Sequence, residues 1–354
     1  MADQDIVIAS GGLISPIGLS LPEAAASARA RVARIRESEL SDSRHEAYLV
    51  GRVPDDALPP LVPALADLPL QARESRMLRM AHAALEEALS PLAGHATPIP
   101  LLLGLPEHHT TLPIDPAAFL GRLAQQVPGV LDIRHSLAVP RGRAAGLMAL
   151  CEAASRLRRG NEPFILVGGV DCLVDPFILG TFDFERRIRN DINSDGFSPS
   201  EGAAFLLLST AAVARAQGVE PLAQVVGSAH GFEAGHLYSD DKYLGEGLCA
   251  AFASIFEETP PPSPIGSVYC SFNGERYWAR EFGVARLRLN DAFVPEPRME
   301  HPAECFGDMG SAVGVALAAL AAHGVHKGYR EAPCLVYASS DRGERAVSLL
   351  VPST

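Results

Sequence analysis

Basic residues are scarce in this sequence relative to acids. The 354 residues include 30 Lys and Arg against 42 Asp and Glu, which gives a formal net charge of −12 at pH 7. Nucleic acids and anionic membrane surfaces both favour a basic face, so we expect neither as a partner. The chain also lacks any apolar run that approaches the roughly 20 residues of a membrane-spanning helix, and its first residues show no signal-peptide pattern. We therefore expect a cytoplasmic protein.

Paired cysteines and metal-binding motifs are missing as well. The six cysteines have no paired spacing, which is typical of reduced, mostly buried thiols. Residues 191–196 (DINSDG) imitate the start of a calcium loop, but the position where that motif needs an acid is Gly202. The stretch Glu107-His108-His109 lacks further ligands at sensible spacing. We expect no metal and no cofactor. The cysteines are Cys151, Cys172, Cys249, Cys270, Cys305 and Cys334.

What the chain does contain is apolar segments that alternate between strand and helix patterns. At 47% hydrophobic residues it can bury one large core or two closely packed halves. Strands alternating with helices predict an α/β fold with largely parallel sheets. The predicted strands are 5–10, 98–105, 135–139, 164–167, 203–208, 222–228, 265–270, 286–290, 334–338 and 346–351. The predicted helices are 21–36, 75–89, 147–159, 211–217, 248–257, 275–282 and 310–323, and residues 40–70 are predicted to be irregular with short helical pieces.

The same order of parts occurs twice. Around residues 142–167 a Gly-containing turn, an Ala-rich helix, a Gly stop and a Glu-Pro pair precede a strand. Around residues 310–337 a similar turn, an Ala-rich helix, a Gly and an Ala-Pro pair precede another strand. We therefore predict two similar halves, residues 1–215 and 216–354, packed as one compact unit.

The segment from Leu131 to Asp171 is the part around which the chain is organised. A strand that turns sharply into a helix directs the turn residue and the first free amides of the helix at one point. Enzymes often place a nucleophile there. In this chain the turn offers Arg143.

Four stretches in order resemble the β-ketoacyl synthase branch of the thiolase superfamily. Residues 10–18 (SGGLISPIG) are similar to its opening TGxGxxTPxG, and residues 143–171 are similar to its CxSG, helix, AGGxE segment. Residues 195–203 (DGFSPSEGA) resemble DGFVxGEGA, and residues 307–314 lie where the family carries GHxxGAAG. The resemblance covers nearly the whole chain. It implies a thiolase fold, five-layered αβαβα with two pseudo-repeated βα halves, that usually dimerises.

The resemblance also implies that the catalytic Cys-His-His residues of the family are lacking. The nucleophilic Cys aligns with Arg143, whose guanidinium stays protonated and is not a nucleophile. The first His of the family falls at or near residues 270–274, and the second near Gly307 and Asp308. The Gly-rich segment that helps form the oxyanion site is replaced by residues 341–345 (DRGER). The chain therefore resembles a ketosynthase that cannot condense.

A cation at a helix N-terminus is unfavourable by roughly 0.3–1 kcal/mol, so we expect an anion beside Arg143. One interpretation is an internal ion pair with Asp308 or Glu275 that plugs the old pocket. The other is an anion-binding site for a phosphate or carboxylate, built from Arg143 and the helix amides. The candidate lining residues are Gly142, Arg143, Ser271, Asn273, Glu275 and Asp308.

Two classes of function remain open. The first is a catalytically degenerate, ketosynthase-like accessory subunit, related to polyketide chain-length factors or to accessory factors of bacterial secretion systems. Such a subunit would form a homodimer, or a heterodimer with a related chain, and bind a protein partner. The second is an acyltransferase or β-ketoacyl synthase-type enzyme that uses a relocated nucleophile. The candidates for that role are the thiols of Cys270 and Cys305 and the hydroxyls of Ser136 and Ser271, with Asp308 as a further catalytic candidate.

Overall fold

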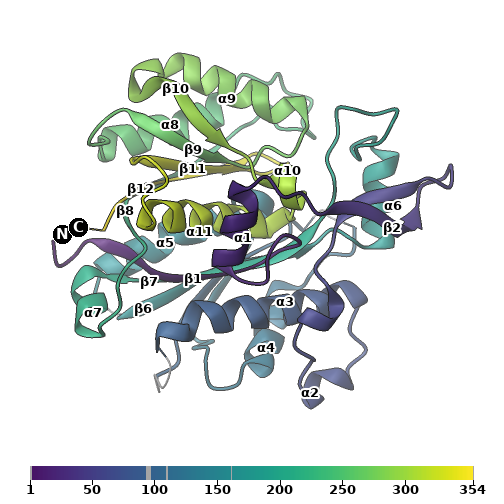
Figure 1. Cartoon of the computed structure of the whole chain (residues 1–354), viewed down its shortest axis with the longest axis horizontal. Helices are drawn as coiled ribbons and strands as arrows, with labels where there is room; N and C mark the ends of the chain where they lie inside the picture. Colours follow the sequence, from purple (N-terminus) through teal and green to yellow (C-terminus); the bar gives the residue numbers. More distant parts are fainter. Residues whose placement is uncertain (1, 93–96, 109–110, 161, 354) are drawn as a thin grey trace.

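A computed structural model describes residues 2–92, 97–108, 111–160 and 162–353. Ten strands form one hydrogen-bonded sheet in the order β10-β9-β11-β12-β8-β1-β7-β6-β4-β5. Only two residue pairs, Val7 with Gln224 and Ile8 with Ala223, join β8 to β1, so the sheet divides there into two five-stranded halves (Figure 1). The first half contains β1 (Ile6–Ile14), β4 (Leu101–Leu105), β5 (Leu137–Pro140), β6 (Phe164–Cys172) and β7 (Glu201–Thr210). The second half contains β8 (Ala223–Phe232), β9 (Ile265–Cys270), β10 (Phe293–Glu300), β11 (Cys334–Ser339) and β12 (Glu344–Val351).

The strand pairing of the first half is repeated in the second. Strand β4 lies parallel between β5 and β6, and β7 runs antiparallel to both β6 and β1. In the same way β9 lies parallel between β10 and β11, and β12 runs antiparallel to both β11 and β8. The predicted pseudo-repeat is confirmed. The prediction of largely parallel sheets was wrong, because each half adds two antiparallel strand pairs to its parallel core. The domain limits at 215 and 216 stay a prediction.

Helices form three layers around the two half-sheets (Figure 1). Helices α3 (Ala72–Leu89) and α4 (Pro116–Gln126) cover the outer face of the first half, and α8 (Glu246–Glu258) and α9 (Arg276–Arg288) cover that of the second. Helices α5 (Ala145–Arg158) and α11 (Val313–His326) fill the middle layer, with α1 (Leu21–Arg29) beside α11. Both middle helices are rich in alanine. Helix α11 is almost fully buried and α5 buries 8 of its 14 residues, because apolar side chains reach them from both half-sheets. The predicted five-layered αβαβα arrangement is confirmed.

The remaining elements lie at the periphery. A hairpin of β2 (Ile35–Ser41) and β3 (Ala47–Gly51) packs against α6 (Pro176–Phe184) through a small apolar cluster. The other helices are α2 (Pro63–Ala66), α7 (Ala211–Ala216) and α10 (Ala303–Phe306), and the 3-10 turns are Asp55–Ala57, Ser90–Leu92, Gly142–Ala144, Asn290–Ala292 and Gly310–Ala312. Among the described residues no helix combines the length and the apolar character needed to cross a membrane.

Several predicted boundaries were wrong for physical reasons. The helix predicted for 21–36 ends at Arg29, and Arg31 has a φ of +56°, a left-handed conformation that a helix cannot continue through. In the range 286–290, where a strand was predicted, residues 286–288 end α9 and Asn290 begins a 3-10 turn, and strand β10 follows that turn. Helix α4 and the β2–β3 hairpin were not predicted. Strand β1 does not stop before Gly12 but continues to Ile14. A Cβ on Gly12 would lie 2.0 Å from the backbone oxygen of Ala84 in α3, so this glycine permits close helix packing.

Candidate functional site

The predicted turn between strand and helix is present. Strand β5 ends at Pro140, Gly142 takes a left-handed φ of +66°, and the 3-10 turn Gly142–Ala144 leads into α5. A Cβ on Gly314 of α11 would lie 2.8 Å from the backbone oxygen of Arg143, so this glycine lets the two middle helices meet at the turn. The turn thereby buries the Arg143 side chain, which is 5% exposed, where the two halves meet.

Two carboxylates hold the Arg143 guanidinium. Its Nε donates to Asp308 Oδ2 at 2.8 Å, its Nη2 donates to the same oxygen, and its Nη1 donates to Asp341 Oδ1. Asp308 precedes the turn that begins α11, the repeat counterpart of the turn that holds Arg143, and its Oδ1 accepts from the Gly310 amide at 2.9 Å. The predicted contact with Asp308 is present. Glu275 is not a partner of Arg143, because it binds a second arginine.

That second arginine is Arg187. Its Nε and Nη2 donate to the two oxygens of Glu275 at 2.7 and 2.8 Å, and its Nη1 donates to Asp341 Oδ2 at 2.8 Å. Asn273 links Glu275 to Asp308, because its Nδ2 donates to Glu275 Oε2 at 3.0 Å and to Asp308 Oδ2 at 2.8 Å. Together these contacts link the six side chains in a closed ring. We name this set the ionic ring: Arg143, Asp308, Asn273, Glu275, Arg187 and Asp341.

The ionic ring is largely buried and has aromatic rings on its flanks. The guanidinium carbon of Arg143 lies 5.8 Å from the Phe197 ring and 5.5 Å from the Trp278 ring, and that of Arg187 lies 5.3 Å from the Phe197 ring. Burial raises the pKa of Asp341, but the charges of Arg143 and Arg187 outweigh burial and hold it well below its usual range. Two guanidinium groups face three carboxylates, so the ring carries one net negative charge.

The candidate residues divide into two groups. Gly142, Arg143, Asn273, Glu275 and Asp308 all lie in or beside the ring. The other candidates lie apart from the ring. Three of the five N–H groups of Arg143 already donate to carboxylates of the chain, one from each guanidinium nitrogen, which favours the ion-pair interpretation over the anion-site interpretation.

The relocated nucleophiles are not set up for attack. Cys270 lies in the outer apolar cluster of the second half, its thiol donates to the Glu300 carbonyl, and burial raises its pKa to about 12. Burial also raises the pKa of Cys305. Ser271 Oγ accepts from the Ser339 amide at 3.0 Å, and Ser136 Oγ donates to the Asp132 carbonyl. Within the described ranges, none of the four has a hydrogen-bonded histidine or carboxylate as a base.

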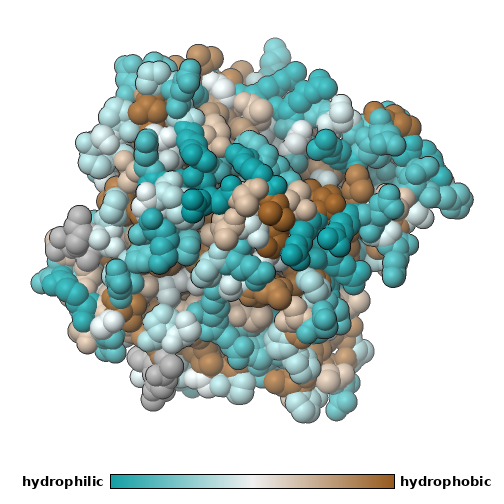
Figure 2. Space-filling view, in the orientation of Figure 1, coloured by the Kyte–Doolittle hydropathy of each residue, from teal (hydrophilic) through white to brown (hydrophobic). Residues whose placement is uncertain are grey.

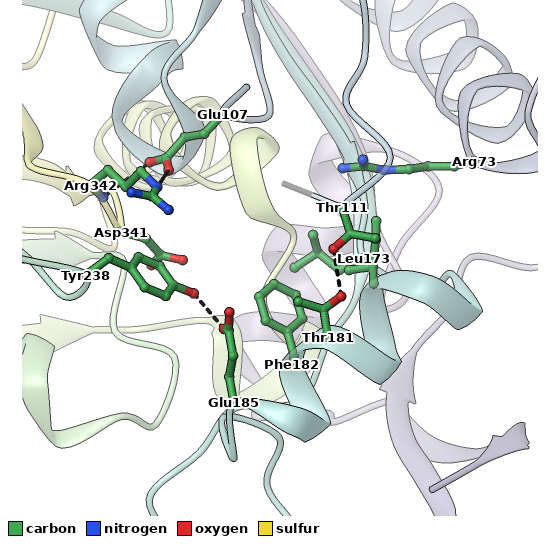
Figure 3. A pocket seen from close by; sticks show the side chains of 11 residues that line it. Arg73, Glu107, Thr111, Leu173, Thr181, Phe182, Glu185, Tyr238, Asp341 and Arg342 are labelled. Atoms are coloured by element: carbon green, nitrogen blue, oxygen red, sulfur yellow. Dashed lines mark hydrogen bonds and ion pairs between the residues drawn. The ribbon is translucent and has the colours of Figure 1, made fainter. Parts of the chain in front are cut away.

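A small cavity of about 80 Å³ adjoins the ionic ring and shares Asp341 with it (Figure 3). Tyr238 OH accepts from Arg187 Nη1 at 2.8 Å and donates to Glu185 Oε2 at 2.6 Å, so the ring extends into the cavity wall. Burial and the nearby Asp341 charge raise the pKa of Glu107 to about 7. The lining consists of Arg73, Glu107, Thr111, Leu173, Ile178, Thr181, Phe182, Glu185, Tyr238, Asp341 and Arg342.

Sequence reasoning missed Arg187 and Tyr238 and did not assign Asp341 to Arg143. Arg187 and Asp341 are separated by 154 residues, so no spacing pattern pairs them. The one sequence signal for further charged partners was chemical, because an Arg143 with more than one carboxylate partner calls for additional charged residues nearby. Of the stretch Glu107-His108-His109, His109 lies outside the described residues. In the described ranges no group of three or more His, Cys, Asp and Glu side chains is placed to hold a metal ion.

Sequence comparison finds relatives for the middle of the chain. Residues 135–214 match the family described as Beta-ketoacyl synthase, N-terminal domain. The chain is 35% identical over 101 residues to Erythronolide synthase EryA2 of Saccharopolyspora erythraea, which covers 27% of this chain and 3% of that protein. It is 34% identical over 106 residues to Actinorhodin polyketide putative beta-ketoacyl synthase 2 of Streptomyces coelicolor, which covers 25% of this chain and 26% of that protein. The matches thus span only a small part of these relatives.

Structural comparison extends over the whole chain. The ishigamide ketosynthase/chain length factor superposes with a TM-score of 0.78 and 17% identity, covering 100% of both chains. A structure titled AntDE:AntF, a type II PKS acyl-carrier protein in complex with its ketosynthase, gives 0.76 and 16%, covering 99% of this chain and 100% of that one. The ketosynthase from module 6 of the bacillaene synthase of Bacillus subtilis 168 gives 0.77 and 15%, covering 99% and 72%. The chain has the thiolase fold of the ketosynthases. This fold carries the ionic ring at the turn into α5.

Proposed function

We propose that this chain is a ketosynthase-fold protein without condensing activity that serves as an accessory, partner-binding subunit in the cytoplasm. The observation that supports this most strongly is the ionic ring at the turn before α5. The turn directs Arg143 at the point where a nucleophile would act, and the Arg143 guanidinium forms ion pairs with the carboxylates of Asp308 and Asp341. A protonated guanidinium cannot attack a thioester.

The surroundings of the ring support the loss of acyl chemistry. A working thiol nucleophile needs a lowered pKa and a neighbouring base, whereas burial raises the pKa values of Cys270 and Cys305. The adjoining cavity of about 80 Å³ is much smaller than the roughly 300–1,000 Å³ of ordinary ligand pockets, so it has little room for a growing acyl chain. We therefore propose that this chain functions through its surface.

The edge strands of the sheet support a dimer. Strand β5 pairs with β4 on one side only, and Leu137 on it is 46% exposed. The opposite edge strand, β10, carries Pro295 and Pro297, which remove backbone donors and discourage further pairing. Strand β5 is short and ends at Pro140, but residues 137–139 keep their backbone donors, so we propose that this edge joins the chain to a second copy or to a related subunit. The named ketosynthase/chain length factor neighbour is a precedent for the second arrangement.

Co-expression with a ketosynthase and an acyl carrier protein encoded beside this chain tests the proposal. The accessory role predicts that the ketosynthase co-purifies with this chain and that product formation needs both proteins, while this chain alone releases no product from acyl-thioesters. The control is the ketosynthase expressed alone. Equal product with and without this chain would refute the biosynthetic form of the role. If the neighbouring genes encode secreted effectors instead of a ketosynthase, the same co-purification is done with those effectors and tests the secretion-associated accessory role.

A further inference from the structure

Strand β1 has a strand partner on both sides over only part of its length. Strand β7 pairs with β1 along its whole length, but on the opposite side β8 pairs with it only at Val7 and Ile8. Next to these pairs, the Leu222 amide donates to the Ile8 carbonyl at 2.8 Å. In the part of the chain that the structure describes, no strand lies beside residues 9–12 on this side. We name residues 9–12 the open β1 edge.

Gly11 presents its backbone groups at the open β1 edge. The pairing of β1 with β7 is regular from Ser10 to Ile14. Within it the Leu13 amide donates to Glu87 Oε2 at 2.9 Å, and so points away from β7. Backbone groups two residues apart on a strand point to the same side, so the N–H and C=O of Gly11 also point away from β7. Such an edge is a template for another strand, and glycine has no side chain to hold a second backbone at a distance.

A groove of about 720 Å³ lies along the open β1 edge. Its other lining residues come from α1, from the end of α3 and the turn after it, from the segment after α7 and from the end of α11. Along β1 the open edge is bounded at Ile8 by Leu222 and at Leu13 by the Glu87 carboxylate, which also accepts from the Leu21 amide at 2.8 Å. At about 3.3 Å per residue, this leaves room beside β1 for an extended segment of roughly three or four residues.

The groove favours recognition of a backbone over recognition of a charge. Acidic Glu87 and Glu220 line it together with basic Lys327, so neither sign of charge is selected. Pro22 and Leu222 supply apolar contacts. Figure 1 shows α1 and α11 on the near face of the molecule, and Figure 2 shows hydrophobic residues there in small areas separated by hydrophilic ones. This face therefore suits a short segment better than a broad apolar interface.

We propose that the groove binds a short extended segment of a partner protein, which adds to β1 as a further strand. The segment accepts a hydrogen bond from the Gly11 N–H and donates one to the Gly11 carbonyl, and its small apolar side chains contact Pro22 and Leu222. Strands β7, β6 and β4 separate β1 from β5, so this site is distinct from the proposed dimer edge. The inference goes beyond the accessory role and uses no residue of the ionic ring, so each idea can fail without the other.

The test uses NMR spectroscopy of the isotope-labelled full chain. The probe is the blocked tetrapeptide acetyl-Val-Thr-Val-Thr-amide, and the comparison peptide has the same sequence with N-methylated amides, which cannot donate. The variant Gly11→Pro removes the amide donor at a position where edge strands tolerate proline. Gly11→Ala keeps the donor and is the matched control, because both variants add a Cβ about 3.1 Å from a methyl carbon of Leu206.

In the free protein the Gly11 amide should exchange with solvent roughly 100-fold or more faster than the amide of Gly12, which points towards β7. Millimolar tetrapeptide should shift the Gly11 amide resonance and slow its exchange, and the N-methylated peptide should do neither. Gly11→Pro should bind the tetrapeptide about tenfold more weakly than Gly11→Ala does, as followed through the resonances of neighbouring residues.

A Gly11 resonance that millimolar tetrapeptide leaves unshifted would overturn the proposal. So would equal binding of the two peptides, or equal binding by the two variants. Slow exchange of Gly11 in the free protein would show that its amide is already paired, and slow exchange that grows with protein concentration would assign the groove to a second copy; either result overturns the partner proposal. Should Gly11→Pro fail to fold, the comparison of the two peptides on the wild type decides.

Discussion

At the scale of single residues, the proposed loss of condensing activity rests most on Arg143. Its guanidinium lies in the interior with Asp308 and Asp341, and neither carboxylate could be buried alone. Buried ion pairs of this kind owe much of their effect to mutual dependence, since each charge is costly once its partner is gone. The ring therefore both fills the site and fixes how the two halves meet there.

Replacing Arg143 with methionine tests that dependence. Arg143→Met leaves Asp308 buried without its cation, while Asp341 keeps only Arg187, so the free energy of unfolding in urea should fall by about 3–5 kcal/mol. The exposed Arg134→Met is the matched control and should change it by less than about 0.5 kcal/mol. The pair Arg143→Met, Asp308→Asn should lose less than the sum of the two single changes. A small effect of Arg143→Met, comparable to the control, would contradict the ring.

Glu107 gives the site a pH dependence. Its pKa rises from 4.5 to about 7 in the folded protein, so the folded state holds a proton there that the unfolded state has already released. Stability linked to this group is therefore complete below about pH 4.5 and is lost as the pH rises to about 7, by roughly 3 kcal/mol at 1.36 kcal/mol per pKa unit. Urea unfolding of wild type and Glu107→Gln at pH 5 and pH 7 measures it. The variant should gain on the wild type as the pH rises; parallel curves would refute this.

At the scale of elements, strand β5 is the part of the fold that a partner is expected to complete. Leu137→Asp places a charge on this exposed edge, which should disrupt strand pairing between chains while leaving the monomer folded. Leu287→Asp on α9, where the side chain is 81% exposed, is the matched control. Native mass spectrometry and light scattering should show dimer for the wild type and the control, and monomer for Leu137→Asp. A dimer that survives Leu137→Asp would move the interface away from β5.

The sequence predicted the elements whose patterns are strong and missed those whose patterns conflict. Helix α3, helix α5 and strand β9 were found because their apolar spacing is regular and their ends carry clear stops. The hairpin was missed because charged residues break the alternation of β2, and β10 was missed because its two prolines imitate a loop. In the site, motif order supplied Arg143 and Asp308. The Arg187–Glu275 pair spans 88 residues and follows from topology alone.

At the scale of the whole molecule, the chain has a thiolase fold in which the protein's own charged side chains fill the region before α5. Both half-sheets, the three helix layers and the turn into α5 are in place, and they hold the ionic ring between the halves. We therefore propose that this chain functions through surfaces such as the β5 edge, and not through an acyl pocket.

The intact mass of the protein after incubation with acyl-thioesters tests this central claim most directly. Acetyl and longer acyl-thioesters are mixed with the wild type, with Cys270→Ser and with Cys305→Ser, and an active ketosynthase is the positive control. The account predicts that the control gains one acyl group, while this chain gains no more mass than the background reaction of its thiols in a denatured sample. A stoichiometric acyl adduct on the folded wild type, lost in either cysteine variant, would contradict the account.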